Sequence, residues 1–284
     1  MDTDKVFESI TDDIKNERYG MVRPKIDSIL GYTDDVMIKL KCASILKTID
    51  DEEGCQDIVD MILDSVPEDR ERRMDMAKSV RSLGRAEEAY ALMKDMKDDP
   101  ANIPEIARTL NIIGEHEEAL DLMRKVNDMS VDDMILLCNI LCSLGEFREA
   151  EETAGKVIEM DGGTYASYTN MVAVMMKAGK VKEANKFAKS KLKQDKKKAD
   201  LLALEAYVLW VNGKIPGAAN YANRALQVDY SHAGALETMA MCLIEKGKYI
   251  QAKMLAGVIN DKDPNNPAVM RILDACRVAA KVSA

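Results

Sequence analysis

The chain has 284 residues, a hydrophobic content of 47% and a net charge of −9. Such an acidic chain is a poor general binder of nucleic acid, and its longest largely apolar stretch, residues 201–211, is far shorter than the roughly 20 residues that cross a bilayer. With 3 Phe, 1 Trp and 19 Met, and without alternating runs of β-branched and aromatic residues, the composition favours an all-α fold.

The N-terminal segment and the cysteines predict a cytoplasmic protein. Acidic residues occupy the N-terminus, where a signal peptide needs a basic segment followed by an apolar one. The cysteines contain no C-x-x-C pair, so reduced thiols are expected. They are Cys42, Cys55, Cys138, Cys142, Cys242 and Cys276.

The sequence contains no recognisable motif for catalysis or for binding a metal or cofactor. His116 and His232 are the only histidines, and neither has a second ligand at metal-binding spacing. No phosphate-binding glycine motif or nucleophile elbow occurs either. We therefore expect no metal, no cofactor and no catalytic residue, which predicts that the protein is not an enzyme.

A short phrase, Gly followed five residues later by Ala, recurs along most of the chain. The glycines are separated by 30, 31, 34, 34 and 34 residues, and the same steps lead back to Asp50 and Glu17. They are Gly84, Gly114, Gly145, Gly179, Gly213 and Gly247. This period is typical of helical hairpins in which the glycine permits the chain to reverse between two helices.

A second small or compact residue lies seven positions before each glycine or its counterpart. Such residues permit two helical backbones to approach closely. They are Ala43, Ala77, Ala107, Cys138, Val172, Ala206 and Ala240. The pattern predicts a degenerate hairpin over residues 1–35, tandem hairpins over 36–266 with the third and fourth shortened, and a single closing helix over 267–284.

The segment ALETMAMCLIEKGKYIQAKMLAGVINDKDPNN, which contains the expected Pro264, resembles the tetratricopeptide repeat. The resemblance implies a right-handed superhelical solenoid of about eight helix-turn-helix hairpins. It also implies a concave groove, lined mainly by the first helix of each hairpin, that binds a partner protein or peptide. The protein is therefore predicted to be a non-catalytic scaffold or adaptor.

Positions that flank the buried stripe of each first helix are the candidate contact residues. In the second half of the chain they are Asn139, Asn170, Met176, Tyr207, Trp210 and Met241. Their apolar and aromatic character suits an apolar helix or an extended peptide, although ordinary packing between repeats would explain some of them. The carboxylate clamp of the family is not reconstituted, because only Asn170 fits its middle position.

In the first half of the chain the corresponding positions are largely basic. They include Lys41, Lys47, Lys78, Arg81 and Arg108. We call these five residues the basic stripe. They suggest an alternative function, an assembly or maturation chaperone for an acidic client, while solubilisation of an exposed helix face also explains them.

Two further segments carry alternatives. The cationic run Lys189–Lys198 ends a second helix, where basic residues favour the helix dipole, but an acidic partner, including nucleic acid, is a weaker alternative. The closing helix has an apolar stripe formed by Val269, Ile272, Leu273 and Cys276. That stripe either caps the last hairpin or allows self-association with a second copy.

Overall fold

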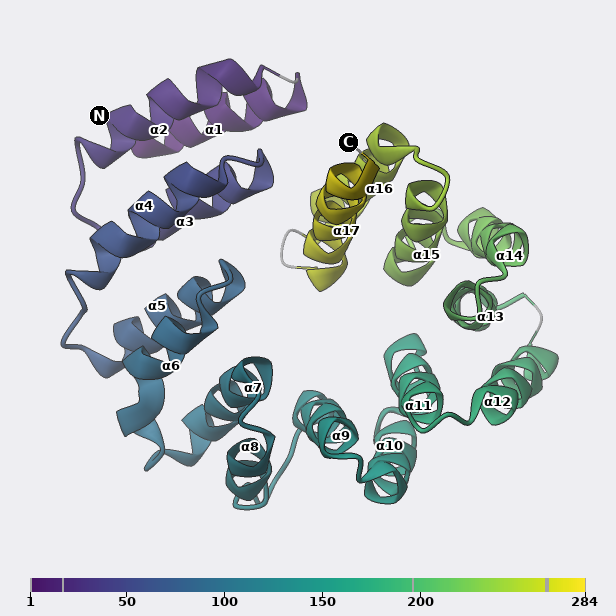
Figure 1. Ribbon diagram of the computed structural model, residues 1–284. Helices are drawn as coiled ribbons and strands as arrows, with labels where there is room; N and C mark the ends of the chain where they lie inside the picture. Colours follow the sequence, from purple (N-terminus) through teal and green to yellow (C-terminus); the bar gives the residue numbers. More distant parts are fainter. Residues whose placement is uncertain (1, 17, 196, 264–265, 284) are drawn as a thin grey trace. The chain divides into compact units, whose positions relative to one another are not determined.

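The computed structural model describes residues 2–16, 18–195, 197–263 and 266–283, and every regular element among them is a helix (Figure 1). Two residues named in the sequence analysis lie outside the described residues. They are Pro264 of the repeat-like segment and Lys196 of the cationic run. The chain divides into two compact units, Met1–Asn127 and Asp128–Ala284, a boundary that falls inside the predicted tandem array. Consecutive helices pair as hairpins in both units, as the sequence predicts.

Unit 1 contains four hairpins, with short 3-10 turns at Tyr19–Met21, Lys94–Met96 and Pro100–Asn102. Its helices are α1 (Thr3–Lys15), α2 (Val22–Leu30), α3 (Val36–Thr48), α4 (Glu52–Leu63), α5 (Arg70–Ser82), α6 (Ala86–Met93), α7 (Ile103–Ile113) and α8 (His116–Met123). The third and fourth hairpins are short, as predicted, because α6 and α8 have only 8 residues each.

Unit 2 contains four longer hairpins and the closing helix. Its helices are α9 (Val131–Leu144), α10 (Phe147–Asp161), α11 (Tyr165–Lys177), α12 (Val181–Gln194), α13 (Ala199–Val211), α14 (Ile215–Val228), α15 (Ala233–Ile244), α16 (Tyr249–Lys262) and α17 (Pro267–Ser283). None of the helices in the described part of the chain combines the length and the apolar character needed to span a bilayer.

The repeat register predicted the turns and the helix contacts correctly. Gly145, which follows α9, has φ +79°, a conformation that glycine adopts without steric cost. Asp50, which stands at the glycine position of the second hairpin, has φ +65° and is the only described non-glycine residue with a positive φ. The seven compact residues that precede the turns are all 0% exposed, which confirms their place where paired helices cross.

The closing helix packs its apolar stripe against its own unit. Ile272 and Cys276 are 0% and 2% exposed, and Val269 and Leu273 pack on the same cluster, which α15 and α16 also build. The stripe therefore packs on the last hairpin of its own unit. Self-association through the stripe would require α17 to leave this cluster.

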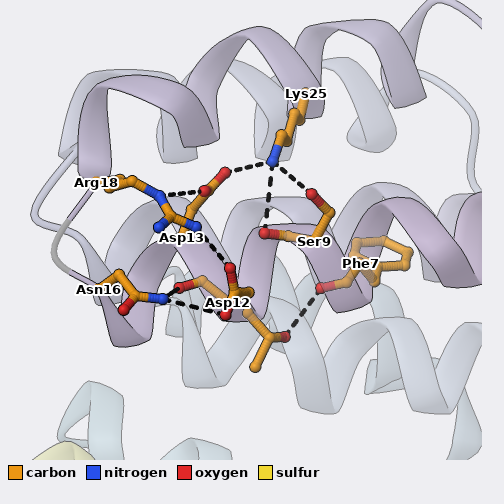
Figure 2. A network of polar contacts seen from close by, with 8 residues as sticks. Phe7, Ser9, Asp12, Asp13, Asn16, Arg18 and Lys25 are labelled. Carbon is orange, nitrogen blue, oxygen red and sulfur yellow. Dashed lines mark hydrogen bonds and ion pairs between the residues drawn. The ribbon is translucent and has the colours of Figure 1, made fainter.

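A polar network holds α1 and α2 together (Figure 2). The Asp13 side chain is only 6% exposed, and Lys25 and Arg18 both bind its carboxylate, the Arg18 Nε at 2.8 Å. Lys25 also donates to the Ser9 hydroxyl at 2.6 Å, which ties α2 to a second turn of α1. These hydrogen bonds from Lys25 and Arg18 lower the pKa of Asp13.

We expect Asp13→Asn to destabilise unit 1 at neutral pH. A depressed folded-state pKa stabilises the protein above the unfolded pKa of about 4 and loses that effect as the pH falls through the folded value. The stability difference between wild type and variant should therefore be constant at neutral pH and shrink below about pH 4. Urea unfolding followed by circular dichroism across this range measures it, and a difference independent of pH would contradict the assignment.

Candidate functional site

The first helices of the hairpins in unit 2 form a continuous surface. Helix α9 packs against α11, α11 against α13, α13 against α15, and α15 against α17. Figure 1 shows these helices along one side of unit 2, with α10, α12, α14 and α16 along the other. We call the surface of α9, α11, α13, α15 and α17 the first-helix face. All six candidate contact residues of the second half of the chain lie on helices that build this face.

Tyr207 and Trp210 form an aromatic pair on α13. Their ring centroids are 6.2 Å apart with an interplanar angle of 41°, and both side chains are half-buried. Tyr207 also packs against the core between α11, α12 and α13, whereas Val211, next to Trp210, is 37% exposed. The pair therefore has a supported inner edge and an outer edge that reaches solvent, as in aromatic anchors of binding surfaces.

The other predicted residues differ in their exposure. Asn139 is exposed, and Met176 and Met241 are half-buried against core clusters. Asn170 is only 8% exposed and lies beside Cys138, a thiol whose pKa burial raises to about 11. Tyr207 and Trp210 are the two aromatic residues among these six, and their rings contact each other.

The buried amide of Asn170 has an unused hydrogen-bond donor. Its Nδ2 has no hydrogen-bond partner among the described residues. A buried donor without a partner destabilises the free protein by about 1–3 kcal/mol. Against the larger effect of burial, the Asn170 side chain lowers the pKa of the neighbouring Cys138 thiol, so its amide belongs to the core and not to the exposed part of the face.

A charged and aromatic cluster that sequence reasoning missed adjoins Tyr207. The Glu237 carboxylate on α15 accepts hydrogen bonds from Arg271 Nε at 2.5 Å and from Nη2 at 2.8 Å on α17. The charge of Glu237 acts on the hydroxyls of both Tyr165 and Tyr207, and burial is the larger cause that raises the pKa of each. Both phenols therefore stay protonated at neutral pH and can donate hydrogen bonds.

The repeat period contained a signal for this cluster. Glu237 and Arg271 are 34 residues apart, so opposite charges occupy the same repeat position on adjacent first helices. The contact positions chosen from the sequence begin one residue later in each repeat and therefore passed over this pair. Tyr165 lies at the start of α11, outside the positions considered.

The basic stripe of unit 1 is engaged in contacts within the chain. Lys41 lies over the Phe7 ring at 4.0 Å, and the nearly buried Lys47 donates to the Ser82 carbonyl at 3.0 Å. Lys78 pairs with Asp75 at 3.3 Å. Each of these three cations therefore has a contact within the chain, although Lys41 and Lys78 also reach solvent.

The two arginines of the basic stripe share one carboxylate. Arg81 pairs with Glu105 at 2.7 Å and donates to the Thr109 hydroxyl at 3.1 Å, while Arg108 pairs with Glu105 at 3.5 Å. Arg81 therefore joins α5 to α7. The side chain that the sequence presents as a ligand contact acts here as a bond between neighbouring hairpins.

Metal-binding geometry does not occur in the described residues, where no group of three or more His, Cys, Asp or Glu side chains could hold an ion. His116 bonds Asn111 at 2.9 Å, and His232 accepts from the Ala235 amide at 3.2 Å and contacts Asp200 at 2.9 Å. Each histidine thus has a local structural partner.

Comparison with known proteins adds evidence on the fold. No protein-family model matches the sequence, and no curated protein matches it. A tetratricopeptide repeat protein from Parabacteroides merdae matches with a TM-score of 0.52 and 13% identity, covering 85% of this chain and 98% of that protein. The chain therefore has the tetratricopeptide-repeat fold, as its sequence resemblance implied.

Two other solved structures match with lower scores. One is YrrB, a tetratricopeptide repeat protein with an unusual peptide-binding site, at a TM-score of 0.34 and 15% identity, covering 63% of this chain and 94% of YrrB. The other is the tetratricopeptide repeat domain of P58(IPK), at a TM-score of 0.34 and 12% identity, covering 99% of this chain and 89% of that domain.

Proposed function

We propose that this protein, which has the tetratricopeptide-repeat fold, is a non-catalytic scaffold or adaptor that holds a partner protein or peptide on the first-helix face of unit 2. The observation that carries the proposal is the half-buried aromatic pair of Tyr207 and Trp210 on this face. Such aromatic rings supply a large contact area on a binding surface.

The chemistry of this face favours a partner segment with apolar side chains. Trp210 and Met241 offer contact area without formal charge, and Met adapts to differently shaped partners. Asn139 adds an exposed amide on α9 for polar groups at the edge of the segment. The six cysteines are all buried thiols, which supports a reducing compartment and agrees with a cytoplasmic location for this function.

We expect Tyr207→Ala combined with Trp210→Ala to weaken partner binding by at least about 30-fold, since each truncation removes an aromatic anchor. Affinity capture from native cell extract identifies the partner by mass, and isothermal titration with that partner then measures the loss. Tyr230→Ala is the matched control, because Tyr230 is 81% exposed in the turn between α14 and α15.

Circular dichroism must show that the double variant keeps its helices. Capture of the same proteins at the same affinity by the wild type and the folded double variant would contradict the proposed site. A partner lost by the double variant and kept by Tyr230→Ala would support it.

A chaperone for an acidic client, using the basic stripe of unit 1, is the second candidate function. We rank it lower because all five basic side chains already contact groups within the chain, as described for Lys47 and Arg81. The two functions differ in their salt dependence, since binding by basic side chains weakens steeply with ionic strength while apolar contacts tolerate salt.

A further inference from the structure

Helix α12 carries four lysines along one line of its solvent-facing side. They are Lys182, Lys186, Lys189 and Lys193, and all four are exposed. We call them the lysine stripe. At 100° per residue these positions fall within an arc of about 60°, and they extend over about 16 Å of helix.

Helix α4 carries four carboxylates at the same spacing. They are Glu53, Asp57, Asp60 and, at the helix C-cap, Asp64, and all four are exposed. We call them the acidic stripe. The steps of four, three and four residues are identical to those of the lysine stripe, and the two stripes occupy the same positions of their repeats. The two helices thus present rows of opposite charge with matching intervals.

The same positions do not carry uniform charge in the other long second helices of unit 2. On α14 they are Pro216, Asn220, Asn223 and Gln227, and on α10 they are Arg148, Glu152, Gly155 and Glu159. A solvent-facing position of the repeat therefore does not require one sign of charge. The uniform rows are features of α4 and α12 in particular.

The lysine stripe makes few local contacts. Two other lysines in or beside α12 are engaged: Lys180 pairs with Glu151 at 2.5 Å, and Lys191 lies over the Tyr168 ring at 4.7 Å. In the part of the chain that the structure describes, none of the four stripe lysines forms an ion pair or a hydrogen bond. In the acidic stripe, Asp60 binds Arg85 at 2.9 Å, and the other three carboxylates are open to solvent.

We propose that the lysine stripe of one molecule docks on the acidic stripe of a second copy of this chain. The order of the steps is the same when read in either direction, so the charges align whether the two helices run parallel or antiparallel. Single exposed ion pairs are weak, but several aligned pairs add together, and three of the four carboxylates are open to solvent. Because the contact joins two different surfaces, each pair of molecules leaves one stripe of each kind free, and assembly can continue.

Charge distribution favours a second copy over nucleic acid as the occupant. Residues 1–142 carry a net charge of −14 and residues 143–284 carry +5, so copies attract when the basic part of one meets the acidic part of another. A nucleic acid, which is itself negatively charged, would be repelled by the net charge of −9 of the whole chain. No exposed aromatic side chain stands among the stripe lysines to stack on bases.

Charge reversal at three positions of each stripe tests the docking. One variant is K182E/K186E/K193E, and the other is E53K/D57K/D64K. Lys189 is kept because its charge acts on the buried Glu205, and Asp60 is kept because it binds Arg85. The remaining three positions have the same spacing in both stripes, so each variant reverses equivalent charges.

Sedimentation velocity should show that wild type associates as its concentration rises at about 50 mM NaCl and dissociates at about 500 mM, where screening is much shorter in range. Each triple variant alone should remain monomeric, since three of the four positions in its reversed stripe then carry the same sign as its other stripe. An equimolar mixture of the two variants should associate again, because each then meets its complement. N220E/N223K/Q227E on α14, which changes the equivalent positions without making a row of one sign, is the control and should associate like wild type.

Wild type that stays monomeric at every concentration and salt, or folded variants whose mixture stays monomeric, would overturn the proposal. Circular dichroism establishes that the variants are folded. A labelled DNA duplex of about 20 base pairs provides a further arm. If wild type remains monomeric but binds the duplex, and K182E/K186E/K193E does not, the stripe belongs to nucleic-acid binding instead.

Discussion

Glu205→Met is expected to raise the free energy of unfolding of unit 2 by about 1–3 kcal/mol at neutral pH. Glu205 is only 3% exposed, and its Oε2 has no hydrogen-bond partner among the described residues. The equivalent positions of three other hairpins hold the buried apolar residues Ile106, Leu137 and Met171. Methionine at this position removes the buried carboxylate and keeps a long, adaptable side chain.

The gain in unfolding free energy from Glu205→Met should increase with pH. Burial raises the pKa of Glu205, although the charges of Lys189 and Lys214 oppose that rise. A raised folded-state pKa means that the wild type is relatively most stable below the unfolded pKa of about 4.3 and loses stability as the pH rises through the folded value. The advantage of Glu205→Met should therefore grow from about pH 4 upward and then level off.

Urea unfolding followed by tryptophan fluorescence measures this effect. Trp210 is the single tryptophan of the chain and lies on the same helix as Glu205, so its emission reports on unit 2. Glu205→Gln separates charge from size, because it removes the titration and keeps the shape. Equal stability of wild type and Glu205→Met at pH 7 would show that Lys189 and Lys214 neutralise the buried carboxylate.

Glu205 also marks a limit of sequence-based prediction. The glycine period and the compact residues predict the hairpins, including the turn at Asp50, because both result from local steric demands. From the sequence alone, a glutamate in an apolar first helix would be expected to face solvent. The repeat pattern shows on which face of the helix a residue lies, but it does not show which neighbouring side chains bury that residue. The division of the chain after Asn127 falls within the shortened interval of 31 residues between Gly114 and Gly145, but the shorter period alone does not predict a division there.

The candidate contact residues show a similar limit. Repeat position correctly placed Tyr207 and Trp210 on one helix of the first-helix face, because helical spacing determines which side chains share a side. It did not reveal that Arg81 binds Glu105 of the next hairpin, or that Asn170 is almost covered. Those facts depend on distances between helices, which a repeat period alone does not contain.

Gly234→Ala is expected to destabilise unit 2 by about 1–3 kcal/mol, although alanine is normally the better helix former. A Cβ at Gly234 would lie 2.1 Å from Tyr165 Cε1 and 2.3 Å from Cζ. The ring has little freedom to withdraw, since it also meets the His232 ring edge-on with centroids 5.0 Å apart. Glycine at the start of α15 thus allows the tyrosine of α11 to pack against the backbone.

Two comparisons identify this contact as the cause. In a Tyr165→Ala background, Gly234→Ala should cost little or nothing, and a coupling of about 1 kcal/mol or more between the two changes would demonstrate the clash. Gly257→Ala on α16 is the matched control, because nothing lies within 4 Å of its added Cβ. It should stabilise the helix by about 0.5–1 kcal/mol. Urea titrations followed by Trp210 fluorescence compare these variants, and similar gains from Gly234→Ala and Gly257→Ala would show that the Tyr165 ring moves away freely.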